Sequence, residues 1–440
     1  MSACGADWPM SRFAPAVLAV LLLLHGVATA QTPTGLDALV PPLHRQLAAL
    51  KGIANPPPPP PIVVRSRADA RKFIEEEIDR RYPRARLEAE AKALVAWGLV
   101  PTGFDIRALY VDLMAEQMAA YYDPRGKVMV VGDWLTPMEQ QVALLHELVH
   151  ALQDAEIPLE TYLEHRPGRG GDELLARQAL LEGEAVGLML DVMLRAQGTN
   201  LAALADLSQL RSLMAATSAG QVFDRAPRFL RDLLLFPYIE GLRFVHELRR
   251  RGPWSAMTAM YRDPPRSTAQ ILHPEQRLVR REDPVSITMP DVRAFVSGAG
   301  EIIADDQLGE FALGAVLAVH LGEDAGRAAA EGWRGDVYRL WEHPKGGFAL
   351  AYLIAFRDAS VGAAFARMYG RVMERRHPAL AAGAQHGPGG LVRWHHDGRG
   401  FAVEPRGAEV LVLEAFTDVD AAREVVWRTR PAPSGTDATR

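Results

Sequence analysis

The stretch TPMEQQVALLHELVHALQD occupies residues 136–154, and the interpretation of the whole chain starts from it. Its apolar residues recur every three to four positions, which is the period of an α-helix with one buried face. Thr136 can cap the amino end of such a helix, and Pro137 suits its first turn. The stretch therefore predicts a helix that begins at about residue 136, ends at about residue 154 and packs its apolar face against a core.

Within this helix, His146, Glu147 and His150 form the pattern His-Glu-x-x-His. Residues four apart lie on one face of a helix, so the two imidazoles can bind one tetrahedral metal ion. Zinc lowers the pKa of a bound water toward about 7 and polarises a carbonyl, and a neighbouring glutamate can take up the proton and then deliver it. The pattern predicts a zinc-dependent hydrolase with Glu147 as its general base.

A zinc site of this kind needs a third protein ligand. The metzincin pattern would place Gly at position 153 and His or Asp at position 156, but this chain has Gln153 and Glu156. The remaining standard choice is a glutamate on a second helix, and Glu182 and Glu184 lie in an apolar helical stretch where unpaired charge is costly. We favour Glu182, because the small residues around it would allow close packing against the metal helix. Glu184 would then support a ligand from behind or lie at the surface.

This arrangement resembles the gluzincin-type metallopeptidases, in which His-Glu-x-x-His supplies two ligands and a downstream glutamate the third. The sequence Glu-Gly-x-Ala at residues 182–185 is similar to the setting of that glutamate in several branches. The interval between His150 and Glu182 is longer than in the best-known gluzincins, and a loop over residues 157–171 would accommodate the excess. The wider sequence, over most of residues 104–274, is similar to uncharacterised exported bacterial proteins grouped as peptidase-MA-like. The resemblance implies a gluzincin-like core with a small sheet, bound Zn2+ and a peptide or protein substrate.

Other residues are candidates for supporting roles. Asp154 could orient a ligand histidine, or it could face solvent at the helix end. His273 or Tyr238 could donate a hydrogen bond to the oxyanion formed during hydrolysis, although both residue types are more often structural. Residues 127–131 predict a short strand, which is either an edge strand able to bind substrate backbone or an ordinary interior strand.

Composition limits the kind of protein this can be. The chain has 440 residues, 48% of them hydrophobic, and a net charge of −5. It is long enough for two or three domains, and it has no global basic field, so we expect no nucleic-acid partner. Its one cysteine, Cys4, excludes an intramolecular disulfide and a cysteine-rich zinc site.

The amino terminus has the features of a signal peptide over residues 1–30. Arg12 precedes the apolar residues 14–24, and Ala28-Thr29-Ala30 forms a small-residue cleavage pattern. The apolar run is shorter than the ~20 residues that a membrane-spanning helix needs. We therefore expect cleavage near Ala30, no stable membrane span in the mature chain, and export to the periplasm or the medium.

Beyond the signal peptide, the sequence predicts three segments. Residues 31–65, which include a polyproline run from Pro56 to Pro61, read as an arm or linker. Residues 66–300 read as a mainly helical zincin-like metallohydrolase domain, and residues 307–430 as an α+β unit. The predicted fold class is α+β, mainly helical, and the predicted function is that of an exported zinc metallopeptidase. The alternative is an envelope binding or maintenance protein that retains the metallopeptidase fold without cleaving anything.

Overall fold

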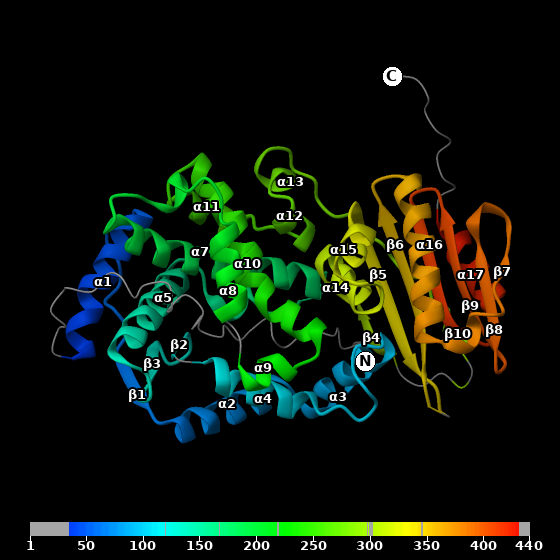
Figure 1. Cartoon of the computed structure of the whole chain (residues 1–440), viewed down its shortest axis with the longest axis horizontal. Coiled ribbons are helices and arrows are strands. Elements are labelled where there is room, and N and C mark those ends of the chain that lie inside the picture. The colour runs from blue at the N-terminus through cyan, green and yellow to red at the C-terminus, as the bar shows by residue number, and fades with distance from the viewer. Residues whose placement is uncertain are drawn as a thin grey trace.

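The chain divides into a mainly helical region and a region built on a large sheet, as Figure 1 shows. We call them the helical region (residues 35–296) and the sheet region (residues 302–430). The predicted signal peptide lies outside the residues that the computed structural model describes, which are 35–118, 120–166, 168–217, 220–296, 298, 302–344 and 346–430. The predicted class, α+β and mainly helical, is confirmed.

The helical region consists of helices around one small sheet. Its strands are β1 (Ile62–Arg65), β2 (Ala120–Asp123) and β3 (Val128–Gly132). Its α-helices are α1 (Leu36–Lys51), α2 (Arg67–Arg81), α3 (Arg84–Ala96), α4 (Ile106–Gln117), α5 (Pro137–Glu156), α6 (Leu159–Tyr162), α7 (Gly171–Arg195), α8 (Ser208–Thr217), α9 (Gln221–Arg225), α10 (Arg228–Arg251), α11 (Ala256–Arg262), α12 (Thr268–Leu272) and α13 (Glu275–Leu278).

The segment predicted to be an arm or linker contains regular structure at both of its ends. Residues 36–51 form α1, which packs against α5 and α7, with Leu47 and Ala48 fully buried. Residues 62–65 form β1, which pairs in parallel with β3. The proline run joins α1 to β1, so the prediction of an extended segment applies to it alone. The prediction failed for α1 because Pro41 and Pro42 lie inside that helix and disguise its periodicity.

The small sheet has the strand order β1-β3-β2. β3 corresponds to the strand predicted at residues 127–131, and it lies between the other two, so it is the interior strand of the two alternatives. β2 is the end strand of this sheet, where it pairs with β3, and it also contacts α5. The edge strand that borders the metal-binding helix is therefore β2.

Helices α7 and α10 lie so close together that a Cβ atom on the glycines at their contact would overlap the neighbouring backbone. A Cβ atom on Gly183 would lie 2.2 Å from the carbonyl carbon and oxygen of Gly241, and one on Gly241 would lie 2.0 Å from the oxygen of Ala179. The small residues around Glu182 do permit close packing, but their partner is α10 and not the metal helix. Helix α10 continues without a break through Pro237.

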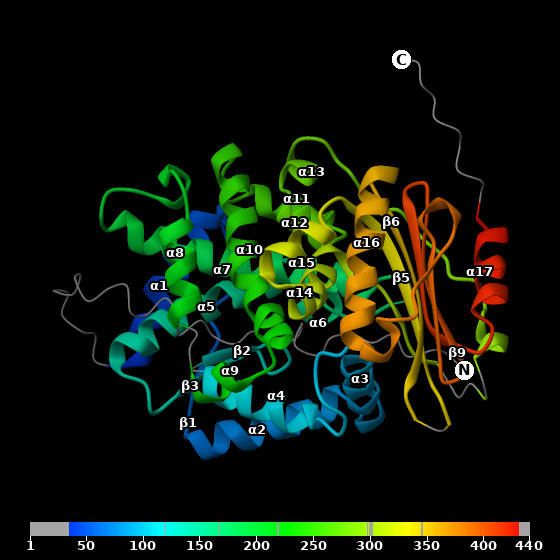
Figure 2. The same ribbon diagram turned by 45° about the vertical axis from the view of Figure 1, so that its right-hand side comes forward.

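The sheet region contains seven strands in the order β4-β5-β6-β10-β9-β8-β7. Figure 2 shows α16 and α17 on opposite sides of this sheet. Two separate sets of buried residues, one including α16 and the other α17, account for this arrangement. The elements are β4 (Ile302–Asp306), α14 (Gly309–Leu321), α15 (Glu323–Ala330), β5 (Trp333–Glu342), β6 (Phe348–Phe356), α16 (Ala359–Arg376), β7 (Gln385–His386), β8 (Val392–His396), β9 (Arg399–Arg406), β10 (Glu409–Phe416) and α17 (Val419–Arg428).

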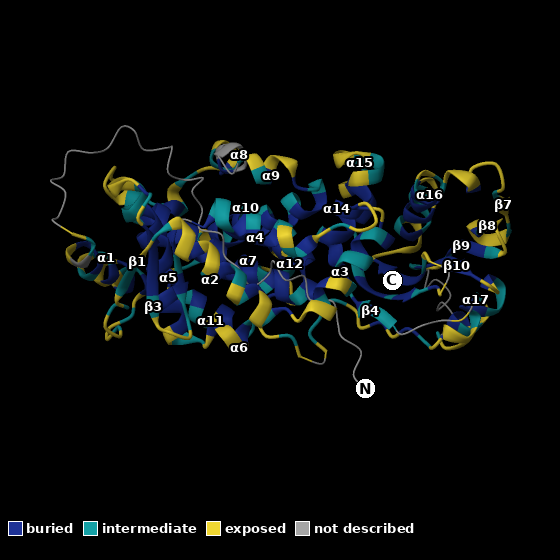
Figure 3. Cartoon of the chain, turned by 90° about the horizontal axis from the view of Figure 1, so that it is seen from below, coloured by how far each residue is buried: buried dark blue, intermediate teal, exposed yellow. Residues whose placement is uncertain are grey.

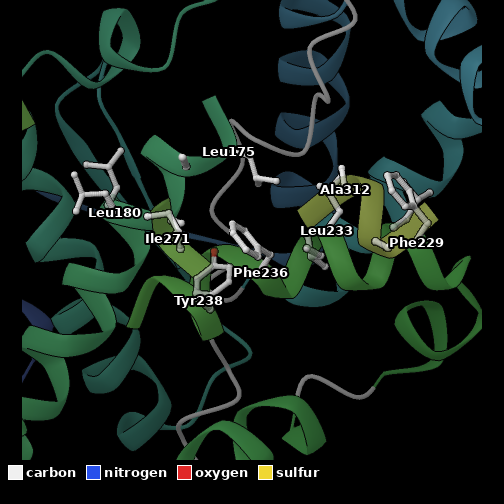
Figure 4. Packing of buried hydrophobic residues seen from close by; sticks show 14 of the residues in the cluster. Leu175, Leu180, Phe229, Leu233, Phe236, Tyr238, Ile271 and Ala312 are labelled. Atoms are coloured by element: carbon white, nitrogen blue, oxygen red, sulfur yellow. The ribbon is translucent and has the colours of Figure 1, made fainter. Parts of the chain in front are cut away.

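One hydrophobic core joins the two regions. Buried residues of α10, including Phe229, Leu233 and Phe236, belong to the same cluster as Ala312 of α14 and Ile271 of α12, as Figure 4 shows. Figure 3 shows buried residues continuing from the helical region into the sheet region. Within the described residues, no helix is both long and apolar enough to cross a membrane.

Candidate metal centre

Helix α5 begins as the sequence predicts. The Thr136 hydroxyl accepts a hydrogen bond from the amide of Glu139, whose carboxylate in turn accepts one from the amide of Thr136 at 2.8 Å. This reciprocal pair is a capping box, and Pro137 occupies the first turn. Every residue from Val142 to Asp154 is buried, because α1, α7, β2 and β3 all contact the helix. The face that carries the two histidines is therefore buried as well as the apolar face.

Three side chains converge between α5 and α7. The Nε2 atoms of His146 and His150 lie 3.1 Å apart, and Oε2 of Glu182 lies 3.3 Å from the first and 3.5 Å from the second. Ligand atoms at the usual bond lengths from a tetrahedral zinc ion lie roughly 3.4 Å apart. The three separations thus match three edges of a zinc tetrahedron, and these residues form a group that could hold a metal ion.

The charges of this group, and its buried oxygen without a hydrogen-bond partner, also fit a divalent cation. Oε2 of Glu182 is buried, yet it has hydrogen-bond geometry to neither imidazole. Burial acts to raise the pKa of Glu182, but His150 and His146 outweigh it and lower that pKa to about 2. Burial acts to lower the pKa of His150, but the Glu182 carboxylate outweighs it and raises that pKa to about 9. A buried anion thus faces two imidazoles, which is the donor set that zinc prefers.

One carboxylate oxygen of Glu147 accepts a hydrogen bond, and the other has no partner in the described structure. Its Oε2 accepts a hydrogen bond of 2.7 Å from the backbone amide of Tyr122 in the edge strand β2. Its Oε1 is buried without a hydrogen-bond partner in the described structure. Burial raises the pKa of Glu147 above its ordinary value. A carboxylate with a raised pKa and a free oxygen is suited to accept a proton.

A cleft runs over the metal-binding group. Glu147, His150 and Glu182 line it together with residues of α2, β2 and α6. At one end Phe73 stacks on Tyr121, with 4.8 Å between ring centroids. The apolar lining residues are Phe73, Met118, Leu159, Leu163 and Leu181, and the charged ones beyond the metal group are Glu77, Arg80, Arg81, Asp123 and Glu160.

The residue that orients His150 is Gln153, which the sequence prediction did not consider for this role. Its side-chain oxygen lies 2.8 Å from Nδ1 of His150, and its amide nitrogen donates to Oε2 of Glu184 at 2.8 Å. The spacing of three residues along α5 was the available signal, because it places the two side chains on one face. The sequence left two positions for Glu184, behind a ligand or at the surface. Glu184 is fully buried, so it lies behind the ligands.

Asp154 does not contact either histidine. Its carboxylate accepts hydrogen bonds from the hydroxyl of Tyr122 at 2.8 Å and the amide of Leu159 at 3.0 Å, and it pairs with Lys127. These contacts tie the end of α5 to two walls of the cleft. His150 and Asp154 are four residues apart on α5, but the Asp154 carboxylate is engaged by Tyr122, Lys127 and Leu159, which explains the difference from the prediction.

Of the two predicted oxyanion donors, the structure brings only Tyr238 to the metal-binding group. Its ring centroid lies 6.4 Å from that of His146, and its buried hydroxyl has no hydrogen bond in the described structure. Burial and the charges of Glu182 and Glu147 raise the pKa of Tyr238, so the hydroxyl keeps its proton.

His273 lies elsewhere. Its Nε2 atom is 2.7 Å from Oε1 of Glu310 in α14, and both residues line a second cavity between the helical and sheet regions. His273 follows α12, which packs against α7, α10 and α14, and this position directs it to the junction. Its partner is 37 residues away in the sequence, so no local pattern signals the pair.

Comparison with known proteins agrees with this site. Residues 101–189 match the family model of the IrrE N-terminal-like domain, peptidase M78. Residues 297–426 match a domain of unknown function, DUF8575. No curated protein and no solved structure matches the chain. The first match includes His146, His150 and Glu182, so the chain contains a metallopeptidase-like domain that carries this buried metal-binding group.

Proposed function

We propose that the chain is a zinc-dependent hydrolase of amide bonds, most simply a peptidase that acts on peptides or proteins after export. The observation that carries this proposal is the convergence of three buried metal donors with a further carboxylate, that of Glu147, which lines the cleft and has one oxygen without a hydrogen-bond partner among the described residues. The gluzincin resemblance of the sequence and the metallopeptidase-like match support the same conclusion.

The residues divide into a binding set and a proton-transfer group. His146, His150 and Glu182 would hold the ion. Bound zinc supplies Lewis acidity, which activates water and polarises a carbonyl group. Glu147 would take the proton from the attacking water at its free Oε1 and then deliver it to the leaving amine. The amide of Tyr122 holds the other oxygen of Glu147 in place during both transfers.

Two further features support a peptide as the substrate. The cleft offers apolar residues beside the metal-binding group, which suits a hydrophobic side chain. The edge strand β2 borders the same cleft, and an extended peptide can add to such an edge. Tyr238 supplies a buried, protonated hydroxyl that could donate to the oxyanion of the transition state.

The first experiment measures zinc in the purified wild type and in His146→Ala. We expect one zinc per wild-type chain and a large loss in the variant, and a wild type that does not bind zinc would overturn the proposal. The second digests a peptide library with the wild type and with Glu147→Gln. Cleavage should fall by roughly 100- to 10,000-fold in the variant, which should keep its zinc. A wild type that binds zinc and cleaves nothing would instead indicate an envelope binding or maintenance protein.

A further inference from the structure

Lys51 is a buried lysine at the end of α1, in a segment that the sequence alone predicts to be a linker. Its side chain is 1% exposed, and its Nζ lies 2.5 Å from Oε1 of Glu184 and 3.6 Å from Oε2 of Glu156. The ring of Tyr261 lies 5.4 Å away. A buried ammonium group is costly unless it is paired, so this position requires a reason beyond packing.

The contacts continue from Lys51 to a metal donor. Glu184 accepts hydrogen bonds from Lys51 at one oxygen and from Gln153 and the Tyr261 hydroxyl at the other. The amide nitrogen of Gln153 donates to Glu184 and also to the carbonyl oxygen of Leu181 at 2.9 Å. Both N–H groups of the Gln153 side-chain amide are therefore used on the side that faces Leu181 and Glu184.

This arrangement determines which nitrogen of His150 carries a proton. Because the amide nitrogen of Gln153 faces two acceptors, its oxygen must face Nδ1 of His150, and Nδ1 then donates to it. The other nitrogen, Nε2, faces Glu182 and His146 and is therefore the one left to bind a metal ion. Nδ1 of His146 has no such partner in the described structure, so of the two ligand histidines it is His150 that a side chain orients in this way.

We propose, on the basis of the function above, that Lys51 is a positioning residue for the metal centre. It anchors Glu184, which fixes Gln153 and through it the orientation and tautomer of His150. Helix α1, which contacts α5 and α7, is accordingly part of the structure that supports the metal centre. Loss of Lys51 would leave Glu184 buried without its cation, free the Gln153 amide to turn, and weaken the hold on His150.

The test compares the zinc dissociation constants of four full-length proteins by competition with a chelator. Lys51→Met should bind zinc about 10- to 100-fold more weakly than the wild type, the range typical for residues that support a ligand. The double variant Lys51→Met/Glu184→Gln removes the unpaired charge but keeps an acceptor for Gln153, and it should recover most of the affinity. Lys92→Met is the matched control, since Lys92 pairs with Glu342 at 2.6 Å with both side chains 43% exposed. Its zinc affinity should equal that of the wild type.

A second variant covers the case in which Lys51→Met does not fold. Gln153→Leu leaves the contact of Lys51 with Glu184 intact and removes only the link to His150, so it should also bind zinc about 10- to 100-fold more weakly. In the wild type, nitrogen NMR of the zinc-bound protein should show His150 protonated at Nδ1. Wild-type affinity in either single variant would overturn this inference while leaving the proposed function intact. A wild type whose zinc binding equals that of His146→Ala would remove the proposed function itself.

Discussion

Glu182 in the helical region and Glu414 in the sheet region are both 3% exposed, yet they are paired in different ways. Burial acts to raise the pKa of Glu414, but Arg376 and His377 outweigh it and lower that pKa to about 2, the same value as for Glu182. Glu414 also accepts hydrogen bonds from Arg376 at 2.7 Å and from the Tyr369 hydroxyl at 2.8 Å. Its charge is balanced mainly by a guanidinium group that does not lose its proton.

Among the described residues, the groups that can carry a positive charge beside Glu182 are two imidazoles, and imidazoles exchange their protons near neutral pH. The positive charge that balances Glu182 can therefore be replaced by a metal ion, whereas the charge that balances Glu414 cannot. Degree of burial and pKa do not distinguish a structural carboxylate from a metal ligand in this molecule. The identity of the partners does, and the first two of the following substitutions test that difference.

The largest effect should follow Glu182→Gln. An amide is a poor zinc ligand, so zinc affinity should fall by more than the roughly 100-fold expected for a supporting residue. The zinc-free variant should remain folded, because the rest of the core is unchanged. Chelator competition and circular dichroism measure these two properties. Equal zinc affinity in Glu182→Gln and the wild type would remove the distinction between the two carboxylates.

Arg376→Met should produce the opposite pattern. It leaves Glu414 with a hydroxyl and one histidine, and it also removes the hydrogen bond from Arg376 to the carbonyl oxygen of Ala96 in α3. The free energy of unfolding should fall by ~3 kcal/mol, the typical cost of breaking a buried ion pair from one side. Urea unfolding measures this, with zinc content expected to be unchanged. The exposed residue Arg357, changed to Met, is the control and should alter neither quantity.

The smallest of the three effects compares two helical glycines. Gly183→Ala would force α7 and α10 apart, because the new methyl group would overlap the backbone of Gly241. The free energy of unfolding should fall by ~2 kcal/mol, within the usual range for overpacking. Gly370→Ala in α16 has its nearest neighbour, an atom of Trp394, at 3.8 Å and should be neutral or slightly stabilising. Thermal unfolding of both variants checks this, and similar losses in the two would contradict the packing argument.

Local signals in the sequence identified the centre of the site. The cap of α5, the four-residue spacing of His146 and His150, and the glutamate in an apolar helix can all be recognised without a structure. The choice of Glu182 over Glu184 rested on small neighbours, and the geometry places Glu182 with the histidines. The packing argument behind that choice did not hold as stated, because Gly183 and Ala179 contact α10 and not α5.

Contacts between distant residues set the limit of sequence-based prediction. The link between Lys51 and Glu184 crosses 133 positions, and Lys51 is the last residue of a helix whose prolines conceal it. Assignment of His273 to the site failed for the same reason, since its partner Glu310 lies in a different region of the fold. Export, the identity of the metal and the substrate class remain predictions, because the positions of the backbone and side chains do not by themselves specify them.

The contact between Lys51 and Glu184 also has a consequence for the order of folding. Lys51 and Glu184 are 133 residues apart, so α1 can join its partner helices α5 and α7 only when a long loop closes. Closing so long a loop is slow compared with forming the helices themselves. The support of His150 should therefore form after the helices that carry it, and refolding chains should regain helix before they regain full zinc affinity.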